Sequence, residues 1–213
     1  MLTLHHLGVS QSERIIWLLE ELELPYELKH YTRDPVTRLA PPELRAIHPA
    51  GTAPVLTTEE GVTIAESGAI AQFILARYAD GRLAPATQDA AFPHYLYWFH
   101  FANGNLVPAL GRMMMLHRAE LREDHPMMAF ARERVERALN MLDQRLAASP
   151  WLAGEAFTAA DVMNVFGVTT MLHFSPWDLT PYMHIKAWLE RVSQRPAYQR
   201  ACIQKSPAPG AQG

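Results

Sequence analysis

Hydrophobic and polar positions change their spacing several times near the start of the chain. Apolar residues alternate with polar ones over residues 1–6, which predicts a short strand. Over residues 15–22 they recur at helical spacing, and Pro25 ends that pattern. Alternation returns over residues 26–31. The chain is therefore predicted to begin with a strand, a helix and a second strand.

The following segment predicts a loop-rich stretch, a hairpin and a helix. Residues 33–50 are rich in proline and polar side chains, with room for one helical turn around 43–47. Two short β-prone runs, 54–57 and 62–65, flank a turn sequence and predict an antiparallel hairpin. A helix is expected over residues 67–78. The order is thus βαβ followed by ββα.

The chain changes character after residue 80, where a segment rich in glycine, proline and small polar residues predicts a linker. Beyond it the helical period dominates, and we expect helices over residues 89–118, 126–148, 159–174, 181–194 and 197–204. The predicted fold is an α/β domain followed by an all-α domain. Its bounds are 1–80 for the first domain, 81–88 for the linker, 89–205 for the helical domain and 206–213 for a disordered tail.

Composition narrows the class of partner. Of the 213 residues, 19 are basic and 22 are acidic, and no long run carries one sign, which argues against a nucleic-acid partner. No apolar stretch reaches the ~18 residues of a membrane span, and no leader sequence is recognisable, so we expect a cytoplasmic protein. The histidines lack the spacing of a metal site, and Cys202 is expected to have a packing role.

The first candidate for chemistry is Ser10, at the junction of the first strand and the first helix. A helix N-terminus carries unpaired N–H groups and a partial positive charge, so it stabilises an anion such as a thiolate. A hydroxyl group there could donate a hydrogen bond to sulfur. The alternative is a structural capping box formed by Ser10 and Glu13.

The second candidate is Pro54, which opens a strand in the run GTAPVL. If the Ala53-Pro54 bond is cis, the backbone of Ala53 is exposed and an extended peptide could pair with it. The alternative is a trans proline at a sheet edge.

The third candidate is Glu66-Ser67, where the helix N-terminus can hold a carboxylate and Glu66 can accept from an ammonium group. Its alternative is a plain N-cap at Ser67.

Two features of the second half are explained by folding and packing. Thr158 and Asp161 match a capping box with a hydrophobic staple, which predicts a role in folding. The stretch over residues 95–115 is rich in methionine and aromatic residues, as in a helix packed on two sides. The same residue types also suit a pocket that accepts varied apolar shapes.

Taken in order, these motifs resemble the cytosolic glutathione S-transferase family over the whole chain. The matching features are Ser10 after the first strand, IHPAGTAPVL with Pro54, AESGAI with Glu66 and Ser67, the linker after Tyr78, and FTAADV in the helical half. Each motif is weak singly and specific in combination. The runs WLLEELELPYEL and PPELRAIHPAG are most similar to the bacterial and fungal branch without a catalytic tyrosine.

The resemblance implies a thioredoxin-like glutathione-binding domain and roles for these residues. By resemblance, Pro54 is a cis-proline, the backbone of Ala53 pairs with the cysteinyl residue of glutathione, and Glu66 and Ser67 bind the γ-glutamyl end. Ser10 then hydrogen-bonds the glutathione sulfur and promotes its ionisation.

Two positions depart from the family pattern. His5 and His6 stand where a catalytic tyrosine could occur, and Thr52 stands where many relatives use Lys or Gln to reach the glycyl carboxylate. Ser12 is a fallback donor to sulfur, and a backbone N–H near Gln11 is another.

The implied function is conjugation of glutathione, the co-substrate, to small apolar electrophiles, or reduction of a hydroperoxide with it. A non-catalytic glutathione-binding protein and a glutathione-dependent isomerase or dehalogenase are the alternatives. The resemblance also implies a homodimer. The absence of metal, nucleic-acid and membrane partners is the expectation already given by histidine spacing, charge and the apolar stretches. The predicted electrophile pocket consists of Tyr97, Phe101, Met113 and Met114.

Overall fold

The computed structural model describes residues 1–37 and 39–205, which form two compact units. Among the described residues, the first unit comprises 1–37, 39–82 and 193–205, and the second comprises 83–192. The predicted tail, 206–213, lies outside the described residues. The segment from Ser193 was expected to belong with the helical half, but its helix packs into the first unit.

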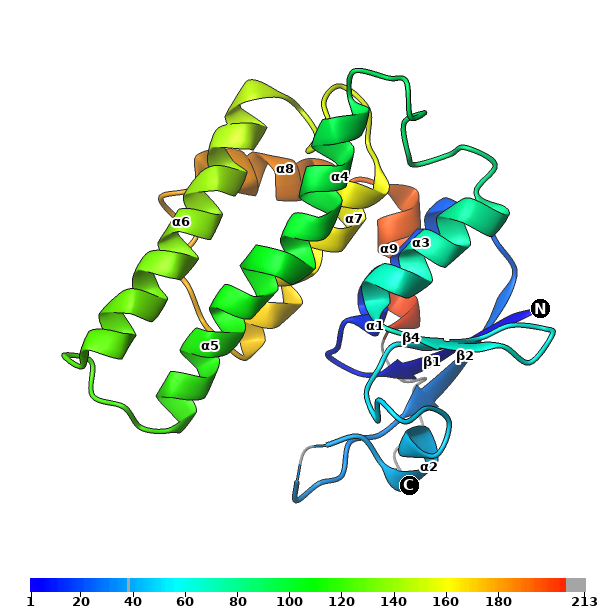
Figure 1. The fold of residues 1–213 in the computed structure, drawn as a ribbon, viewed down its shortest axis with the longest axis horizontal. Helices are drawn as coiled ribbons and strands as arrows, with labels where there is room; N and C mark the ends of the chain where they lie inside the picture. Colours follow the sequence, from blue (N-terminus) through cyan, green and yellow to red (C-terminus); the bar gives the residue numbers. More distant parts are fainter. Residues whose placement is uncertain (38, 206–213) are drawn as a thin grey trace. The chain divides into compact units, whose positions relative to one another are not determined.

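The first unit contains a mixed four-stranded sheet with the strand order β2-β1-β3-β4 (Figure 1). Strand β1 (Leu2–Leu7) is parallel to β2 (Tyr26–Tyr31) and antiparallel to β3 (Val55–Thr57). Strand β4 (Thr63–Ala65) completes the predicted hairpin with β3. This is the thioredoxin-like βαβ–ββα order that the sequence predicts.

Four helices accompany the sheet: α1 (Ser12–Glu21), α2 (Pro42–Arg45), α3 (Ser67–Tyr78) and α9 (Pro196–Gln204). Helix α9 packs on α1, where the rings of Trp17 and Tyr198 meet edge to face with their centroids 4.9 Å apart. The guanidinium of Arg195 also donates two hydrogen bonds, of 2.6 and 2.7 Å, to the carboxylate of Glu21. The last helix is therefore part of the core that supports the first.

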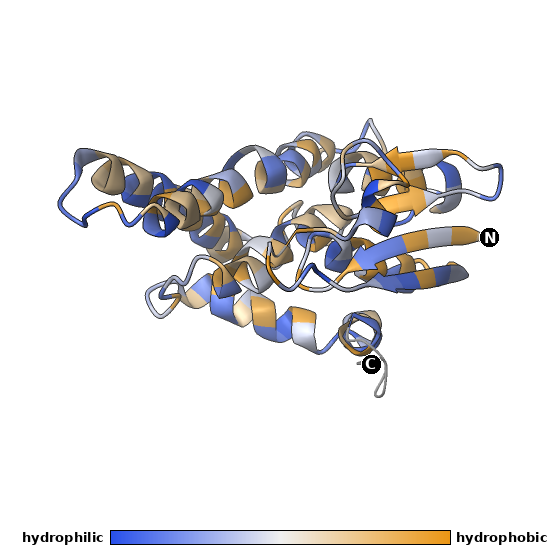
Figure 2. Ribbon diagram, turned by 90° about the horizontal axis from the view of Figure 1, so that it is seen from below, coloured by the Kyte–Doolittle hydropathy of each residue, from blue (hydrophilic) through white to orange (hydrophobic). Residues whose placement is uncertain are grey.

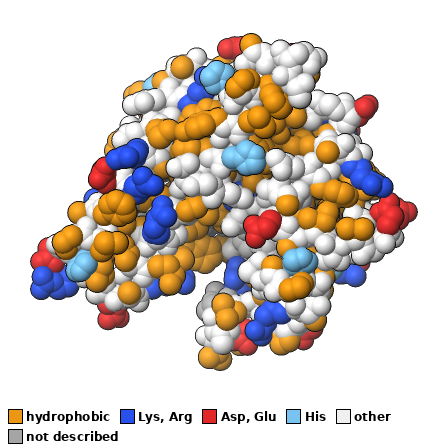
Figure 3. All heavy atoms as spheres, viewed as in Figure 1, with side chains coloured by type: hydrophobic (Ala, Val, Ile, Leu, Met, Phe, Trp, Pro, Cys, Tyr) orange, Lys and Arg blue, Asp and Glu red, His pale blue; other side chains and the backbone are white. Residues whose placement is uncertain are grey.

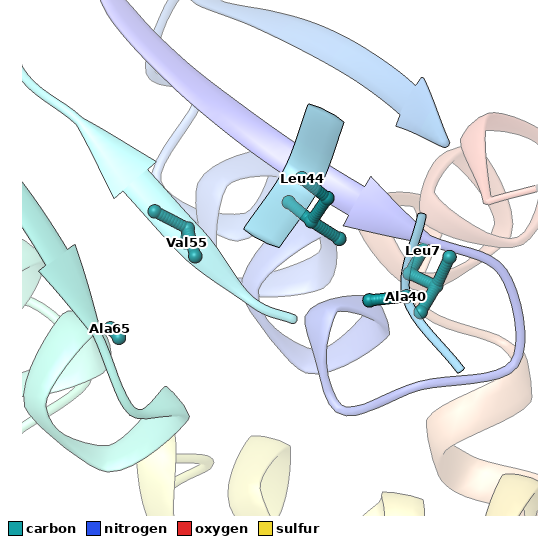
Figure 4. Close-up of a cluster of buried hydrophobic side chains, with 5 residues drawn as sticks. All are labelled: Leu7, Ala40, Leu44, Val55 and Ala65. Atoms are coloured by element: carbon teal, nitrogen blue, oxygen red, sulfur yellow. The ribbon is translucent and has the colours of Figure 1, made fainter. Parts of the chain in front are cut away.

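A small hydrophobic cluster anchors the loop-rich stretch to the sheet (Figure 4). Its side chains come from the end of β1, the segment around α2, the start of β3 and the end of β4: Leu7, Ala40, Leu44, Val55 and Ala65. The half-buried Ala53 packs against the same cluster. Burial of these apolar groups holds the backbone just before β3 in place.

The second unit is all-helical within the described residues. Its α-helices are α4 (Phe92–Phe101), α5 (Val107–Arg118), α6 (Pro126–Ala148), α7 (Ala159–Val165) and α8 (Met183–Ser193). The last residue of α8, Ser193, already belongs to the first unit. Hydrophobic and hydrophilic residues interrupt each other along these ribbons (Figure 2). That pattern is expected of helices that each bury one stripe.

The predicted continuous helix over residues 89–118 is wrong at its middle. Residues Ala102–Leu106 form a π-helical turn, in which the N–H of Val107 bonds to the carbonyl oxygen of Ala102. Pro108 explains the break, because it has no N–H to give to the carbonyl of Gly104 and its ring would clash with that carbonyl in a regular α-helix.

The predicted helix over residues 159–174 is also interrupted. It continues from α7 as two 3₁₀ segments, Phe166–Val168 and Thr170–His173, with Thr169 in a non-helical conformation between them. Gly167 lies at a close approach, since a Cβ atom there would be 2.5 Å from Cδ2 of Leu106. Tertiary packing against the π-helical turn therefore competes with the regular helix.

Figure 3 shows hydrophobic side chains scattered between charged ones on the face in view. The large apolar side chains that are exposed include those of Met115, Met127 and Phe130. Within the part of the chain that the structure describes, no helix has the length and apolar character needed to cross a membrane.

Candidate functional site

The strand registers bring three motifs to one edge of the sheet. His5 of β1 is opposite Val55 of β3, and Val55 is opposite Ala65 of β4. Because both pairings are antiparallel, the end of β1, the start of β3 and the end of β4 lie side by side. The segments containing Ser10, the Ala53-Pro54 bond and Glu66 all emerge at this edge.

A side-chain hydrogen bond joins the two helices that start at this edge. The hydroxyl of Ser67, the first residue of α3, donates to Oε1 of Gln11, directly before α1, at 2.9 Å. The N-termini of α1 and α3 therefore approach each other, and both present backbone N–H groups suited to an anion. Sequence reasoning assigned no such role to the side chain of Gln11, because nothing local marks it.

Ser10 is half-buried and does not form the predicted capping box. The residue at the N-cap of α1 is Gln11, which makes no side-chain cap, and the carboxylate of Glu13 accepts from Lys205 at 3.2 Å. The Oγ atoms of Ser10 and Ser12 are 2.6 Å apart, and the N–H of Ser12 donates to Oγ of Ser10 at 3.3 Å. Ser10 is thus tied to the start of α1 through Ser12.

Ser12, the predicted fallback donor, lies in the interior. Its Oγ is 2.7 Å from Nδ1 of His6, a fully buried ring whose Nε2 is 3.0 Å from the carbonyl oxygen of Lys205. Burial lowers the pKa of His6 below its usual value. Sequence reasoning missed His6, although its proximity to SQS was visible, because its partner Lys205 is 199 residues away.

The peptide bond between Ala53 and Pro54 is cis. Strand β3 begins only at Val55, so Ala53 is not one of the residues that pair with β1 or β4. Its neighbour Thr52 is exposed. An extended ligand could reach the backbone here from the solvent side.

Glu66 has φ 70° and ψ 115° and occupies the N-cap position of α3 without a side-chain cap. The expectation that Ser67 is the N-cap is therefore wrong, because the chain turns one residue earlier. This turn leaves the Glu66 carboxylate exposed and directs the buried Ser67 hydroxyl to Gln11. The pair thus presents one charged and one hydrogen-bonded group beside the start of α3.

The four predicted pocket residues differ in accessibility within the second unit. Phe101 and Met113 are each 2% exposed and pack in the helical core, whereas Tyr97 is 48% exposed and Met114 is half-buried. The rings of Tyr97 and Phe101 have centroids 5.9 Å apart. The electrophile pocket stays a prediction that depends mainly on Tyr97 and Met114.

The Thr158 motif forms the predicted capping box at the start of α7. Asp161 is fully buried and accepts from the N–H groups of Thr158 and Leu152 and from the indole N–H of Trp188. Across residues 1–37 and 39–205, no three His, Cys, Asp or Glu side chains are grouped to hold a metal ion.

Two family descriptions match this chain in the order of its two halves. "Glutathione S-transferase, N-terminal domain" matches residues 10–77, and "Glutathione S-transferase, C-terminal domain" matches residues 106–196. Glutathione S-transferase 3 of Schizosaccharomyces pombe is 34% identical over 210 residues, which cover 92% of this chain and 85% of the relative. The chain belongs to the glutathione S-transferase family.

Solved structures of glutathione transferases share the fold. One from Actinobacillus pleuropneumoniae has a TM-score of 0.87 at 33% identity and covers 96% of this chain and 93% of its own. One from Burkholderia graminis, described with two glutathione molecules bound per subunit, has a TM-score of 0.81 at 26% identity, covering 98% and 89%. These similarities confirm the fold of the family for this chain.

Proposed function

We propose that this chain binds glutathione at the edge where β1, β3 and β4 meet and conjugates it, through its sulfur, to small apolar electrophiles. The observation that carries the proposal is the register of the sheet, which gathers Ser10, Ala53 and Glu66 from three segments. The hydrogen bond between Ser67 and Gln11 supports it by joining the two helix N-termini at the same edge.

Each part of the tripeptide has a chemically suitable partner here. The exposed Glu66 carboxylate accepts from the γ-glutamyl ammonium group, and the α3 N-terminus with Ser67 holds the γ-glutamyl carboxylate. The backbone of Ala53 pairs with the cysteinyl residue, and the cis bond before Pro54 supports this role. Thr52 lies beside the glycyl end, where a hydroxyl supplies a neutral contact.

The reaction needs an ionised sulfur. A free thiol has a pKa near 8.5, so a depression of about one or two units makes most of it thiolate at neutral pH. The N-terminus of α1 and the Ser10 hydroxyl are the groups in position to stabilise that charge. With this assignment, the proposal includes membership of the branch without a catalytic tyrosine.

The chemical step requires no further reactant. The thiolate donates its electron pair to an electrophilic carbon, a sulfur–carbon bond forms, and the leaving group departs with its bonding electrons. Catalysis of this step requires both reactants to be held close together in a productive orientation. We assign the electrophile side to Tyr97 and Met114, with Phe101 and Met113 supporting them from the helical core.

Two properties accompany this function in the proposal. The protein is a cytoplasmic homodimer, and the exposed apolar residues on α5 and α6, including Met115, Met127 and Phe130, support burial against a second copy. Light scattering that gives the mass of a single chain would contradict the dimer.

The decisive experiment uses the full-length protein with glutathione. Calorimetry should detect glutathione binding, and an aryl halide should be conjugated in a glutathione-dependent reaction. A hydroperoxide tested in parallel distinguishes peroxidase chemistry from conjugation. Binding without any thiol-dependent turnover would favour a non-catalytic glutathione-binding protein, and loss of both would refute the proposed function.

A further inference from the structure

A chain of hydrogen bonds runs from the candidate site into the interior of the first unit. It links Ser10 Oγ to Ser12 Oγ at 2.6 Å, Ser12 Oγ to His6 Nδ1 at 2.7 Å, and His6 Nε2 to the carbonyl oxygen of Lys205 at 3.0 Å. Ser12 and His6 are fully buried, whereas Ser10 is half-buried at the site. These hydrogen bonds therefore connect Ser10, the candidate donor to the glutathione sulfur, to His6, a titratable side chain shielded from water.

The last link determines the tautomer of His6. A carbonyl oxygen can only accept, so Nε2 of His6 must carry a hydrogen and donate it to Lys205. In the neutral ring the other nitrogen, Nδ1, is then an acceptor, and the hydroxyl of Ser12 donates to it. The carbonyl oxygen of Leu7 is a competing acceptor for the Ser12 hydroxyl, but it lies 3.5 Å away against 2.7 Å for Nδ1 of His6. Because Ser12 has one hydroxyl hydrogen and gives it to His6, the contact with Ser10 uses the hydrogen of Ser10.

The direction in which the Ser10 hydroxyl donates its hydrogen bond determines whether it suits a thiol or a thiolate. While His6 is neutral, Ser10 gives its hydrogen to Ser12 and presents lone pairs to a ligand, which suits a thiol but not a thiolate. When Nδ1 of His6 is protonated, it donates to Ser12, Ser12 donates to Ser10, and the Ser10 hydrogen is released toward the ligand. Ser10 can then stabilise a thiolate without any link of the chain being broken.

We propose that His6 receives the thiol proton of bound glutathione through Ser10 and Ser12; this inference rests on the proposed function. The sulfur proton passes to Ser10 Oγ, the Ser10 proton to Ser12 Oγ, and the Ser12 proton to Nδ1 of His6. One S–H bond is broken, one N–H bond is formed, and each hydroxyl keeps one hydrogen. The net charge is unchanged, with a thiolate at one end and an imidazolium at the other. His6 touches no ligand and is a positioning residue.

Some surroundings of His6 lower its pKa and others raise it. Burial disfavours the imidazolium and lowers the pKa of His6, so the free protein holds a neutral ring at pH 7. His30 of β2, whose ring centroid is 5.1 Å away, and the ammonium group of Lys205 also lower it. The carboxylate of Glu13 on α1 and the carbonyl of Lys205 raise it. A thiolate at the far end of the chain adds a further favourable charge.

The test is a proton count in the full-length protein. The ultraviolet absorbance of the thiolate gives the amount of ionised glutathione, and calorimetry in buffers of different ionisation enthalpy gives the protons released on binding. In the parent protein, release should be well below one proton per thiolate, because His6 retains the proton. In His6→Asn, which keeps an acceptor toward Ser12 but cannot be charged, release should approach one per thiolate.

His5→Asn is the matched control. His5 is the preceding residue of β1, is also buried, and has both ring nitrogens hydrogen-bonded, to Tyr31 at 2.9 Å and to Thr57 at 3.1 Å. It does not belong to the chain that reaches Ser10. His5→Asn should therefore keep the parental proton count, while His6→Asn should also lower kcat about tenfold with little change in KM for glutathione.

A second variant covers the case in which His6→Asn does not fold. Ser12→Ala removes the middle link and frees the Ser10 hydrogen, so thiolate should form with release of about one proton per sulfur. Release of one proton per thiolate by the parent, or an unchanged count in both variants, would overturn the relay while leaving the proposed function intact. Absence of glutathione binding in the parent would overturn both.

Discussion

Asp161 binds three segments of the helical unit with a single carboxylate. It caps α7 through Thr158, accepts the N–H of Leu152 at 3.0 Å and accepts the indole N–H of Trp188 at 3.1 Å. Burial raises the pKa of Asp161 to about 6, although each of these donors lowers it. The two influences oppose each other, and burial is the larger.

This shift predicts a dependence of stability on pH. Because the folded pKa lies above the unfolded value of 3.8, the folded state binds the Asp161 proton more tightly. The associated stability is present below about pH 4 and is lost as the pH rises through about 6. Urea unfolding of the parent and of Asp161→Asn should show the parent losing stability relative to the variant over this interval, with a constant difference above about pH 7.

The stability difference between the parent and Asp161→Asn, followed over pH, tests the direction of this pKa shift. If the difference is independent of pH, Asp161 does not titrate in this range, and a difference of opposite sign would mean that its hydrogen-bond donors outweigh burial. Asp161→Ala should cost about 2–4 kcal/mol of unfolding free energy at neutral pH, because it leaves several buried donors without an acceptor.

Ser10 is the second residue with a defined expectation. Ser10→Ala removes the hydroxyl hydrogen bond to sulfur and should reduce kcat/KM for conjugation by about 10–100-fold, since hydrogen bonds to charged groups contribute about 1.5–3 kcal/mol. The thiolate absorbance at neutral pH should fall with it. An unchanged turnover would assign thiolate stabilisation to backbone N–H groups at the start of α1 near Gln11.

At the scale of elements, the two irregular segments of the helical unit support each other. The π-helical turn over Ala102–Leu106 directs Leu106 toward Gly167, in the 3₁₀ segment after α7. Leu106 is fully buried, so it has little freedom to move away. The glycine is required here by a close approach.

Gly167→Ala should therefore destabilise the protein by about 1–3 kcal/mol, the usual cost of overpacking a core. Gly111 is the matched control, because it lies within α5 and an added Cβ would meet nothing within 4 Å. Gly111→Ala should stabilise the protein by about 0.5–1 kcal/mol, since glycine is unfavourable within a helix. Thermal unfolding of both variants measures the contrast, and equal shifts would contradict it.

At the scale of the whole chain, the last described helix completes the unit that the first strand begins. Glu21 and Arg195 form a two-point ion pair across 174 residues of sequence, with side chains that are 8% and 29% exposed. Trp17 donates to the same carboxylate at 2.8 Å. These contacts fix α9 on α1 and bring the carbonyl of Lys205 to His6.

A double-mutant cycle tests the strength of this connection. Glu21→Gln and Arg195→Gln should show a coupling free energy of about 1–3 kcal/mol, because the pair is partly shielded from water and bidentate. The exposed pair of Glu60 and Arg77, 3.0 Å apart, is the control and should couple by about 0.2–1 kcal/mol. Equal coupling in the two cycles would mean that the connection between α1 and α9 contributes no more than a surface pair.

The sequence predicted most elements because their signals are local. The periods of β1, α1, β2 and α3, the hairpin and the capping box of α7 each depend on neighbouring residues and their intrinsic geometry. The errors lie where a distant contact or a single proline overrides the period, as at Pro108 and Gly167. The candidate motifs at Ser10, Pro54 and Glu66 were visible for the same local reason.

The sequence by itself therefore determined the elements, their order and the motifs that carry the family resemblance. Only the tertiary structure decided which side chains meet, because Gln11 and Ser67 are 56 residues apart and His6 and Lys205 are 199 apart. Such pairs leave no periodic trace, since the partner of a buried polar group is chosen by strand register and helix packing. The chain from Ser10 to His6 is a product of that packing.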